Sequence, residues 1–163
     1  MLPTIMRKKL IILAVGFLLI ACRTKKNLNK TPELENGWYF ITEQKANSTP
    51  LTDRFTGEMI FIESLPILKA SESSTFEIQK NNWGTDNYEF IQLIFEGKAK
   101  QSWADATERM SRTNEKAAFI YKDEVISIVG TFQKIDNGYS PIVNKDFTTE
   151  ILNEIISELK PEK

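Results

Sequence analysis

YEFIQLIF, residues 88–95, is the stretch on which the fold prediction rests. Its aromatic and β-branched residues predict a strand. The following segment, residues 98–114, predicts a helix, because its apolar residues recur at the spacing of one helical face. The residues on that face are Trp103, Ala106, Thr107 and Met110. A strand that leads into an amphipathic helix indicates a helix packed against a sheet.

Further strands are expected on both sides of this unit. Composition predicts a tight hairpin turn at 122–124 and loops at 42–57 and 131–141. Residues 71–80 fit either a helix that begins with a capping box or a strand with alternating apolar side chains. The segments that predict strands or short extended pieces are 38–41, 58–63, 66–68, 117–121 and 125–129.

A second amphipathic helix is expected at about residues 148–160, with either Asp146 or Thr148 as its N-cap. Its apolar stripe consists of Ile151, Leu152, Ile155, Ile156 and Leu159. Antiparallel-looking strands with two such helices predict an α+β domain of two layers. In this fold class a mainly antiparallel sheet carries both amphipathic helices on one face.

The first 22 residues have the layout of a secretory signal. A basic patch at 7–9 precedes an uncharged apolar run at 10–20, which is shorter than the roughly 20 residues that span a membrane. Ala21 and Cys22 follow the run. Residues 19–22, Leu-Ile-Ala-Cys, resemble the lipobox of bacterial lipoproteins. The resemblance implies that the Cys22 thiol receives a diacylglyceryl group and that cleavage occurs between Ala21 and Cys22.

This motif predicts a signal peptide at 1–21, a lipidated cysteine with a polar tether at 22–36, and a folded domain at 37–163. Two alternatives are a buried free thiol at Cys22, or an ordinary secretory signal with an incidental cysteine. Translation could also begin at Met6.

The expected location is the cell envelope, with the lipid in a membrane and the domain facing the periplasm. Arg23 and Thr24 follow the cysteine, and the lack of an acidic residue there favours the outer membrane.

The composition excludes several kinds of chemistry. The sequence has no histidine, which removes Ser-His-Asp and Cys-His catalysis, and its seven glycines form no phosphate-binding loop. Loss of three basic residues with the signal would leave 18 basic against 22 acidic residues, a net charge of −4 that does not suit nucleic acid. We therefore expect no cofactor, no metal ion and no enzymatic activity.

Carboxylates and one tryptophan remain as candidate functional groups. Glu150, Glu154 and Glu158 share one helical face. A carboxylate-dependent hydrolase would need such groups in one pocket, whereas the amphipathic pattern predicts a solvated face. Trp83 lies in a polar turn. An exposed Trp83 would be a partner contact, and the alternative is that it folds back over the sheet.

Residues 88–159 resemble the head subdomain of the first periplasmic domain of SecD and SecDF, which are accessory subunits of protein export. After an apolar strand, that family has a small residue, an aromatic residue and a threonine at four-residue intervals. Ala99, Trp103 and Thr107 correspond to these positions here. A hairpin at 118–127 and a Phe-Thr-x-Glu motif at 147–150 also match.

The sequence departs from that family at three positions: Ala99, Lys122 and Val129 stand where the family has glycine, aspartate and proline. The sequence also has no segment that resembles the SecD transmembrane helices.

The resemblance implies a SecD-head-like α+β domain at residues 37–163. In that family the head is thought to contact emerging preprotein. We therefore expect a non-enzymatic module that binds unfolded secretory polypeptides, for instance by adding a strand at a sheet edge. The alternatives are a structural envelope lipoprotein with one specific protein partner and, third, a carboxylate-dependent hydrolase.

Overall fold

The computed structural model describes residues 33–81 and 87–160. The chain divides into two compact units, residues 1–33 and 34–163, and the second is the folded domain. Ala21, Cys22 and Trp83 lie outside the described residues, as do the predicted signal peptide and most of the predicted tether. Within the described ranges, no helix is both long enough and apolar enough to cross a membrane.

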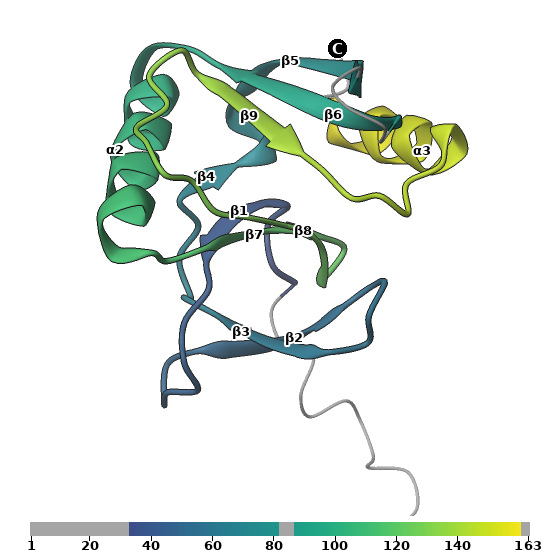
Figure 1. The fold of residues 1–163 in the computed structure, drawn as a ribbon. Coiled ribbons are helices and arrows are strands. Elements are labelled where there is room, and N and C mark those ends of the chain that lie inside the picture. Colours follow the sequence, from purple (N-terminus) through teal and green to yellow (C-terminus); the bar gives the residue numbers. More distant parts are fainter. Residues whose placement is uncertain (1–32, 82–86, 161–163) are drawn as a thin grey trace, which may run out of the picture. The chain divides into compact units, whose positions relative to one another are not determined.

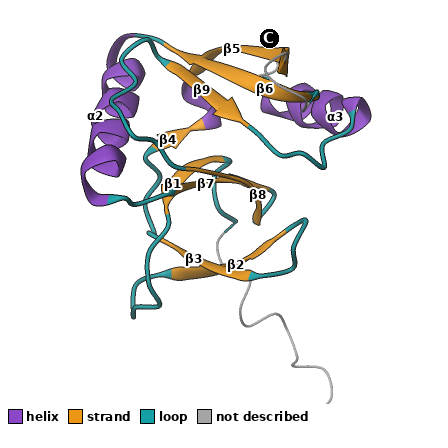
Figure 2. Cartoon of the chain, in the orientation of Figure 1, coloured by secondary structure: helices purple, strands orange, loops and turns teal. Residues whose placement is uncertain are grey.

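Strands dominate the described part of the domain, and two α-helices and one short 3-10 turn accompany them (Figures 1 and 2). In chain order the elements are β1 (Gly37–Phe40), β2 (Thr49–Asp53), β3 (Met59–Ile62), β4 (Leu68–Lys69), η1 (Ala70–Glu72), β5 (Ser73–Asn81), β6 (Tyr88–Phe95), α2 (Gly97–Thr113), β7 (Ala117–Tyr121), β8 (Glu124–Val129), β9 (Tyr139–Ile142) and α3 (Thr149–Leu159).

The strands form two sheets. The larger has the order β3-β2-β8-β7-β1-β4, and all its neighbours are antiparallel except β2 and β8. It curls so that the end of β1 meets β3, where Ile41 and Ile62 form a bridge and Glu63 N donates to Phe40 O at 2.9 Å. The smaller sheet, β5-β6-β9, is antiparallel throughout. The predicted α+β class, with mainly antiparallel strands and two helices, is confirmed, although the strands form two sheets instead of one.

The main hydrophobic core joins both sheets and both helices. At its centre the ring centroids of Trp38 and Trp103 lie 5.4 Å apart, and those of Trp38 and Phe119 lie 5.1 Å apart. The helix α3 adds Leu152 and Ile155, both fully buried. Burial of each such side chain contributes about 1.5–3 kcal/mol to stability. A smaller cluster around Tyr39 and Ile120 lies outside this main core.

The two predicted helices are present with nearly the predicted bounds. Asn114 ends α2 in the left-handed conformation, with φ of 59°, and its N–H donates to Met110 O at 2.9 Å. Thr148 is the N-cap of α3, where its hydroxyl accepts a hydrogen bond from Ile151 N. Thr148, and not Asp146, therefore caps this helix.

Three local predictions need correction or are now decided. The predicted loop at 42–57 contains β2, and the predicted loop at 131–141 contains the start of β9. Pro50 and Gly57 suggested punctuation in the first segment, and the residues at 136–138 suggested a turn in the second. Pro50 and Pro141 nevertheless each lie in a strand opposite a partner, Phe61 and Gln92 respectively. The ambiguous segment at 71–80 is mostly the strand β5, because it pairs along its length with β6.

The domain also begins before the predicted boundary at residue 37. Leu34 N donates to Asp123 Oδ1 at 2.8 Å, and Lys122 N donates to Asn36 Oδ1 at 2.9 Å. Asn36 O accepts a further bond from Ala70 N at 2.7 Å. The last residues of the predicted tether are therefore part of the fold, bonded to the turn between β7 and β8.

Gly138 occupies a position that only glycine suits. Its φ is +82°, and a Cβ atom there would lie 2.2 Å from Phe95 O. We expect Gly138→Ala to lower the free energy of unfolding by about 3 kcal/mol, because left-handed strain and a backbone clash add together.

The matched control is Gly57→Ala, which has a φ of +73° but open space around the added Cβ. We expect this variant to lose only about 1 kcal/mol of the free energy of unfolding, which is the cost of a non-glycine residue in the left-handed conformation. Urea denaturation followed by tryptophan fluorescence measures both losses. Equal losses of stability in the two variants would show that the contact between the added Cβ and Phe95 O has no effect.

Candidate functional site

The strand β5 forms a long edge of the smaller sheet. It has nine residues, and within the described ranges no strand pairs with its outer side. The opposite edge, β9, has four residues including Pro141, and Ser127 of β8 exchanges hydrogen bonds with Val143 just after it, at 2.9 and 3.0 Å. The edges of the larger sheet, β3 and β4, have four and two residues. Among these four edges, β5 therefore offers the longest unpaired backbone.

The pairing of β6 shows which of its backbone groups face β5. In an antiparallel ladder, successive residues direct their N–H and C=O groups alternately to one side and the other. Pro141 of β9 has no N–H and lies opposite Gln92. Two residues further along β6, the Ile94 N–H donates to Ser73 Oγ on the β5 side, at 3.2 Å. Gln92 and Ile94 therefore direct their backbone groups toward β5.

The same alternation then identifies the groups that β5 leaves unpaired. Glu77 lies opposite Gln92, and Gln79 lies opposite Phe90, so these two residues of β5 are bonded to β6. The residues between and beside them direct their N–H and C=O groups to the free side. These residues are Phe76, Ile78 and Lys80.

The two faces of β5 differ. Phe76 is buried and Ile78 is half-buried on the side of the main core, where α3 packs. Glu77 and Gln79 are exposed on the other face, where Gln79 Nε2 donates to Glu77 Oε2 at 3.0 Å. A strand added beside β5 would therefore place alternate side chains near an apolar helix and near a polar, solvated surface.

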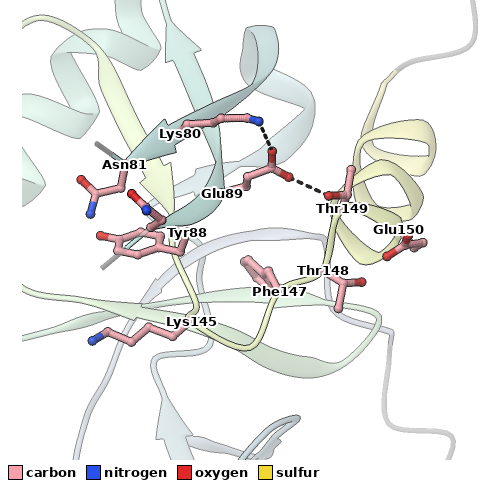
Figure 3. A pocket seen from close by; sticks show the side chains of 10 residues that line it. Lys80, Asn81, Tyr88, Glu89, Lys145, Phe147, Thr148, Thr149 and Glu150 are labelled. Atoms are coloured by element: carbon pink, nitrogen blue, oxygen red, sulfur yellow. Dashed lines mark hydrogen bonds and ion pairs between the residues drawn. The ribbon is translucent and has the colours of Figure 1, made fainter. Parts of the chain in front are cut away.

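A hollow of about 600 Å³ lies at the end of the β5–β6 hairpin, beside the start of α3 (Figure 3). Glu89 projects from β6, where its carboxylate accepts hydrogen bonds from Thr149 Oγ1 at 2.8 Å and from Lys80 Nζ at 3.2 Å. The Thr149 hydroxyl and then the Lys80 ammonium hold the pKa of Glu89 below its ordinary value. The other residues that line the hollow include Tyr88, Lys145, Phe147 and Glu150.

The three carboxylates predicted to share a face do not meet in one pocket. Glu150 lines the hollow, whereas Glu154 and Glu158 bind Lys122 Nζ, at 3.6 and 2.7 Å. Glu150 does share the hollow with Glu89, but the pKa of each is lowered, that of Glu150 by its own backbone N–H and by Thr148. A catalytic carboxylic acid needs the opposite shift, so neither group is suited to donate a proton near neutral pH.

Two polar contacts of α2 were not predicted from the sequence, and both have a structural role. Thr107 is fully buried, and its hydroxyl donates to Ala104 O at 3.0 Å and accepts from Ile135 N at 2.9 Å. It thereby holds the link between β8 and β9 against the helix. Spacing alone placed Thr107 on the apolar face, and nothing local to the sequence identifies Ile135 as its partner.

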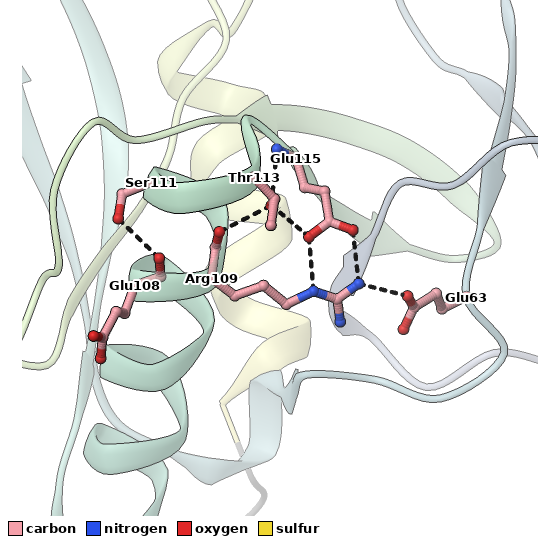
Figure 4. A network of polar contacts seen from close by, with 6 residues as sticks. All are labelled: Glu63, Glu108, Arg109, Ser111, Thr113 and Glu115. Atoms are coloured by element: carbon pink, nitrogen blue, oxygen red, sulfur yellow. Dashed lines mark hydrogen bonds and ion pairs between the residues drawn. The ribbon is translucent and has the colours of Figure 1, made fainter.

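The second contact is the Arg109 cluster, which consists of Arg109, Glu63, Glu115 and Phe40. Figure 4 shows Arg109 with its two carboxylate partners. Arg109 donates to both carboxylate oxygens of Glu115, at 2.7 and 2.8 Å, and to Glu63 Oε1 at 3.0 Å. Its guanidinium carbon lies 3.8 Å from the ring centre of Phe40. Arg109 lowers the pKa of Glu115. The cluster joins the end of α2 to β1 and to the segment after β3.

The comparisons with known proteins identify a fold. No protein-family model and no curated protein matches the chain. Among solved structures, the chain is similar to SecDF, described as a membrane component that enhances protein export, with a TM-score of 0.54 and 13% identity. This match covers 77% of this chain and 62% of that one. A structure of SecDF in a super-membrane-facing form has a TM-score of 0.47 and 12% identity, over 66% of this chain and 16% of that one.

The first of these matches confirms the predicted SecD-like domain at the level of fold. It covers more of the chain than residues 88–159, for which the sequence motifs were recognised. The chain spans less than two thirds of that SecDF chain.

The hollow yields a prediction about Glu89. Thr149→Val removes the hydroxyl but keeps the shape of the side chain, so we expect the pKa of Glu89 to rise toward its ordinary value. Lys80→Met should also raise it, because the Lys80 ammonium lowers the pKa of Glu89 both through its hydrogen bond and through its charge. Carboxyl carbon NMR titration of the full chain in detergent measures both shifts. An unchanged Glu89 titration in Thr149→Val would contradict the contact in Figure 3.

Proposed function

We propose that this chain is a lipid-anchored, non-enzymatic envelope protein whose domain binds extended polypeptides and assists protein export. The observation that carries the proposal is the long free edge of β5 in a domain with a SecD-like fold. The SecDF of known structure is described as a membrane component that enhances protein export, and we propose unfolded polypeptides as the ligands of this edge.

The proposed binding mode is addition of a strand to β5. The polypeptide would pair with the backbone groups of Phe76, Ile78 and Lys80, which the ladder leaves facing outward. Each main-chain hydrogen bond contributes about 0.5–1.5 kcal/mol net, so a few of them give moderate affinity with little dependence on the bound sequence. Binding of many different sequences suits a factor that acts on many secretory proteins. A structural lipoprotein would instead bind one specific partner protein.

The hollow beside the hairpin supports the same mode. It lies at the Lys80 end of β5 and combines both charges with aromatic rings, through Lys80, Glu89, Tyr88 and Phe147. A bound segment that runs past the end of β5 could place side chains of several kinds there. Selectivity in strand addition comes from such pockets for alternate side chains, and this one is mixed in character.

The proposed anchor is the lipid on Cys22, on the strength of the lipobox-like residues 19–22. Residues 23–33 separate that cysteine from Leu34, where the fold begins. Fully extended, this segment reaches about 40 Å, which would keep the binding edge close to the membrane surface. The proposed location remains the periplasmic side of the envelope, at the outer membrane.

The proposed binding edge can be tested by a pair of variants at one residue. Ile78→Pro removes the backbone N–H that faces the free side of β5, while the hydrogen bonds between β5 and β6 keep their donors. Ile78→Ala also shortens the side chain but keeps this N–H. We expect Ile78→Pro to bind labelled unfolded secretory peptides about fivefold more weakly than Ile78→Ala does, the loss of roughly one hydrogen bond.

Fluorescence anisotropy with the full chain in detergent measures this ratio, and circular dichroism checks that both variants are folded. Equal affinities would exclude β5 as the binding edge. A wild-type chain that binds none of the peptides would reject polypeptide binding itself.

The anchor has its own test. The wild-type chain should fractionate with membranes and incorporate a labelled fatty acid, because the Cys22 thiol is the proposed acceptor. Cys22→Ser should incorporate no label and remain either unprocessed or soluble. A Cys22→Ser chain that fractionates with membranes as mature protein would show that lipid on this residue is not the anchor.

A further inference from the structure

We infer that a second copy of this chain pairs with the free edge of β5, antiparallel and about a twofold axis at Ile78. The inference starts from the groups that face outward, those of Phe76, Ile78 and Lys80. In a symmetric antiparallel pair, residues that exchange hydrogen bonds must lie opposite one another. An axis at Ile78 places Ile78 opposite its own copy and Phe76 opposite Lys80, so every outward group meets another.

This register is also the one that the exposed side chains favour. With the axis at Ile78, Glu77 lies opposite Gln79 of the second copy. The Gln79 amide already donates one N–H to Glu77 of its own chain at 3.0 Å, and its second N–H can serve the other Glu77. An axis at Glu77 would instead place two carboxylates opposite each other, which is destabilising. An axis at Gln79 would shorten the paired segment within the described residues.

The face of the smaller sheet that α3 covers is also compatible with this pairing. α3 packs over both β5 and β6. In a symmetric pair both α3 helices would therefore lie on the same face of the joined sheet. Half-buried isoleucines, Ile151 and Ile156, flank the buried stripe of α3 on its two sides. Whichever side faces the axis therefore offers an apolar contact.

The acidic face of α3 does not oppose this arrangement. Glu154 and Glu158 are bound to Lys122 of their own chain, which offsets part of their charge. If β5 also binds polypeptide, as proposed above, the second copy and the peptide compete for one edge. Pairing would then protect an edge strand that is otherwise open to uncontrolled association.

Cysteine crosslinking tests the register with the full chain in its envelope. In the proposed pair, residue 77 of one copy lies directly opposite residue 79 of the other, at a Cα separation of roughly 4.5 Å that permits a disulfide. Residues 77 and 77, or 79 and 79, are diagonal neighbours about 7–8 Å apart, too far for one.

Cells that produce Glu77→Cys and Gln79→Cys chains together should therefore form at least about tenfold more oxidised dimer than cells with either variant alone. Glu77→Cys combined with Gln133→Cys, on an exposed loop, is the matched control, and the wild-type chain gives the background from Cys22. A mixture that crosslinks no better than the single variants overturns the proposal. Peptide binding is measured separately, so its failure and the failure of pairing are distinguishable.

Charge provides an independent readout that leaves the backbone unchanged. Gln79→Lys places a cation opposite Glu77 of the second copy, and Gln79→Glu places a like charge there. We expect the dimer of Gln79→Lys to be about tenfold tighter than that of Gln79→Glu, because two symmetric pairs change together. Gln133→Lys and Gln133→Glu control for net charge. Equal dimer affinities in sedimentation of the detergent-solubilised chains would exclude this register.

Discussion

Trp103 reaches from α2 into the centre of the core, where it is almost fully buried and packs against Trp38 of β1 and Phe95 of β6. Its Nε1 donates to Tyr139 O of β9 at 2.9 Å. One side chain thus holds a helix and both sheets together. The carbonyl that satisfies this buried indole N–H belongs to β9, which completes the smaller sheet. With β9 fixed on one side of β6, the other side is taken by β5, and β5 becomes the edge. The candidate binding edge therefore lies on the side of β6 opposite to the strand that Trp103 bonds.

Local periodicity was enough to predict α2, α3 and β6, because each pattern runs without interruption over several turns or strand residues. Pro50 led to a loop prediction over β2, and the turn residues at 136–138 led to one over the start of β9. Pro50 tolerates a strand because β2 pairs with β8 only from Thr52 onward, and Pro141 tolerates one because it lies opposite Gln92 at a position that needs no donor. The separation into two sheets could not be predicted, since β1 pairs with β4 and β7, which lie far from it in the sequence.

Less of the candidate site than of the fold could be predicted from the sequence. The spacing of Ala99, Trp103 and Thr107 led to the SecD-like fold but says nothing of which strand lies at an edge. That property depends on the pairing of β6 with β9, whose residues are some fifty positions apart. The Arg109 cluster is hidden for the same reason, because Glu63 lies 46 residues away. Trp83, the predicted partner contact, lies outside the described residues and stays a prediction, as do lipidation of Cys22 and the absence of enzymatic activity.

The hydrogen bonds of Leu34 and Asn36 to the β7–β8 turn have a mechanical consequence. A load that reaches the domain through the preceding chain first meets Asp123 and Lys122, and only then the ladder of β1. Lys122 also forms ion pairs with Glu154 and Glu158 of α3. Tension would therefore be shared between the β7–β8 hairpin, at the centre of the larger sheet, and the helix α3, which packs against β5. A load applied through Leu34 is thus distributed over two elements before it reaches the β1 ladder.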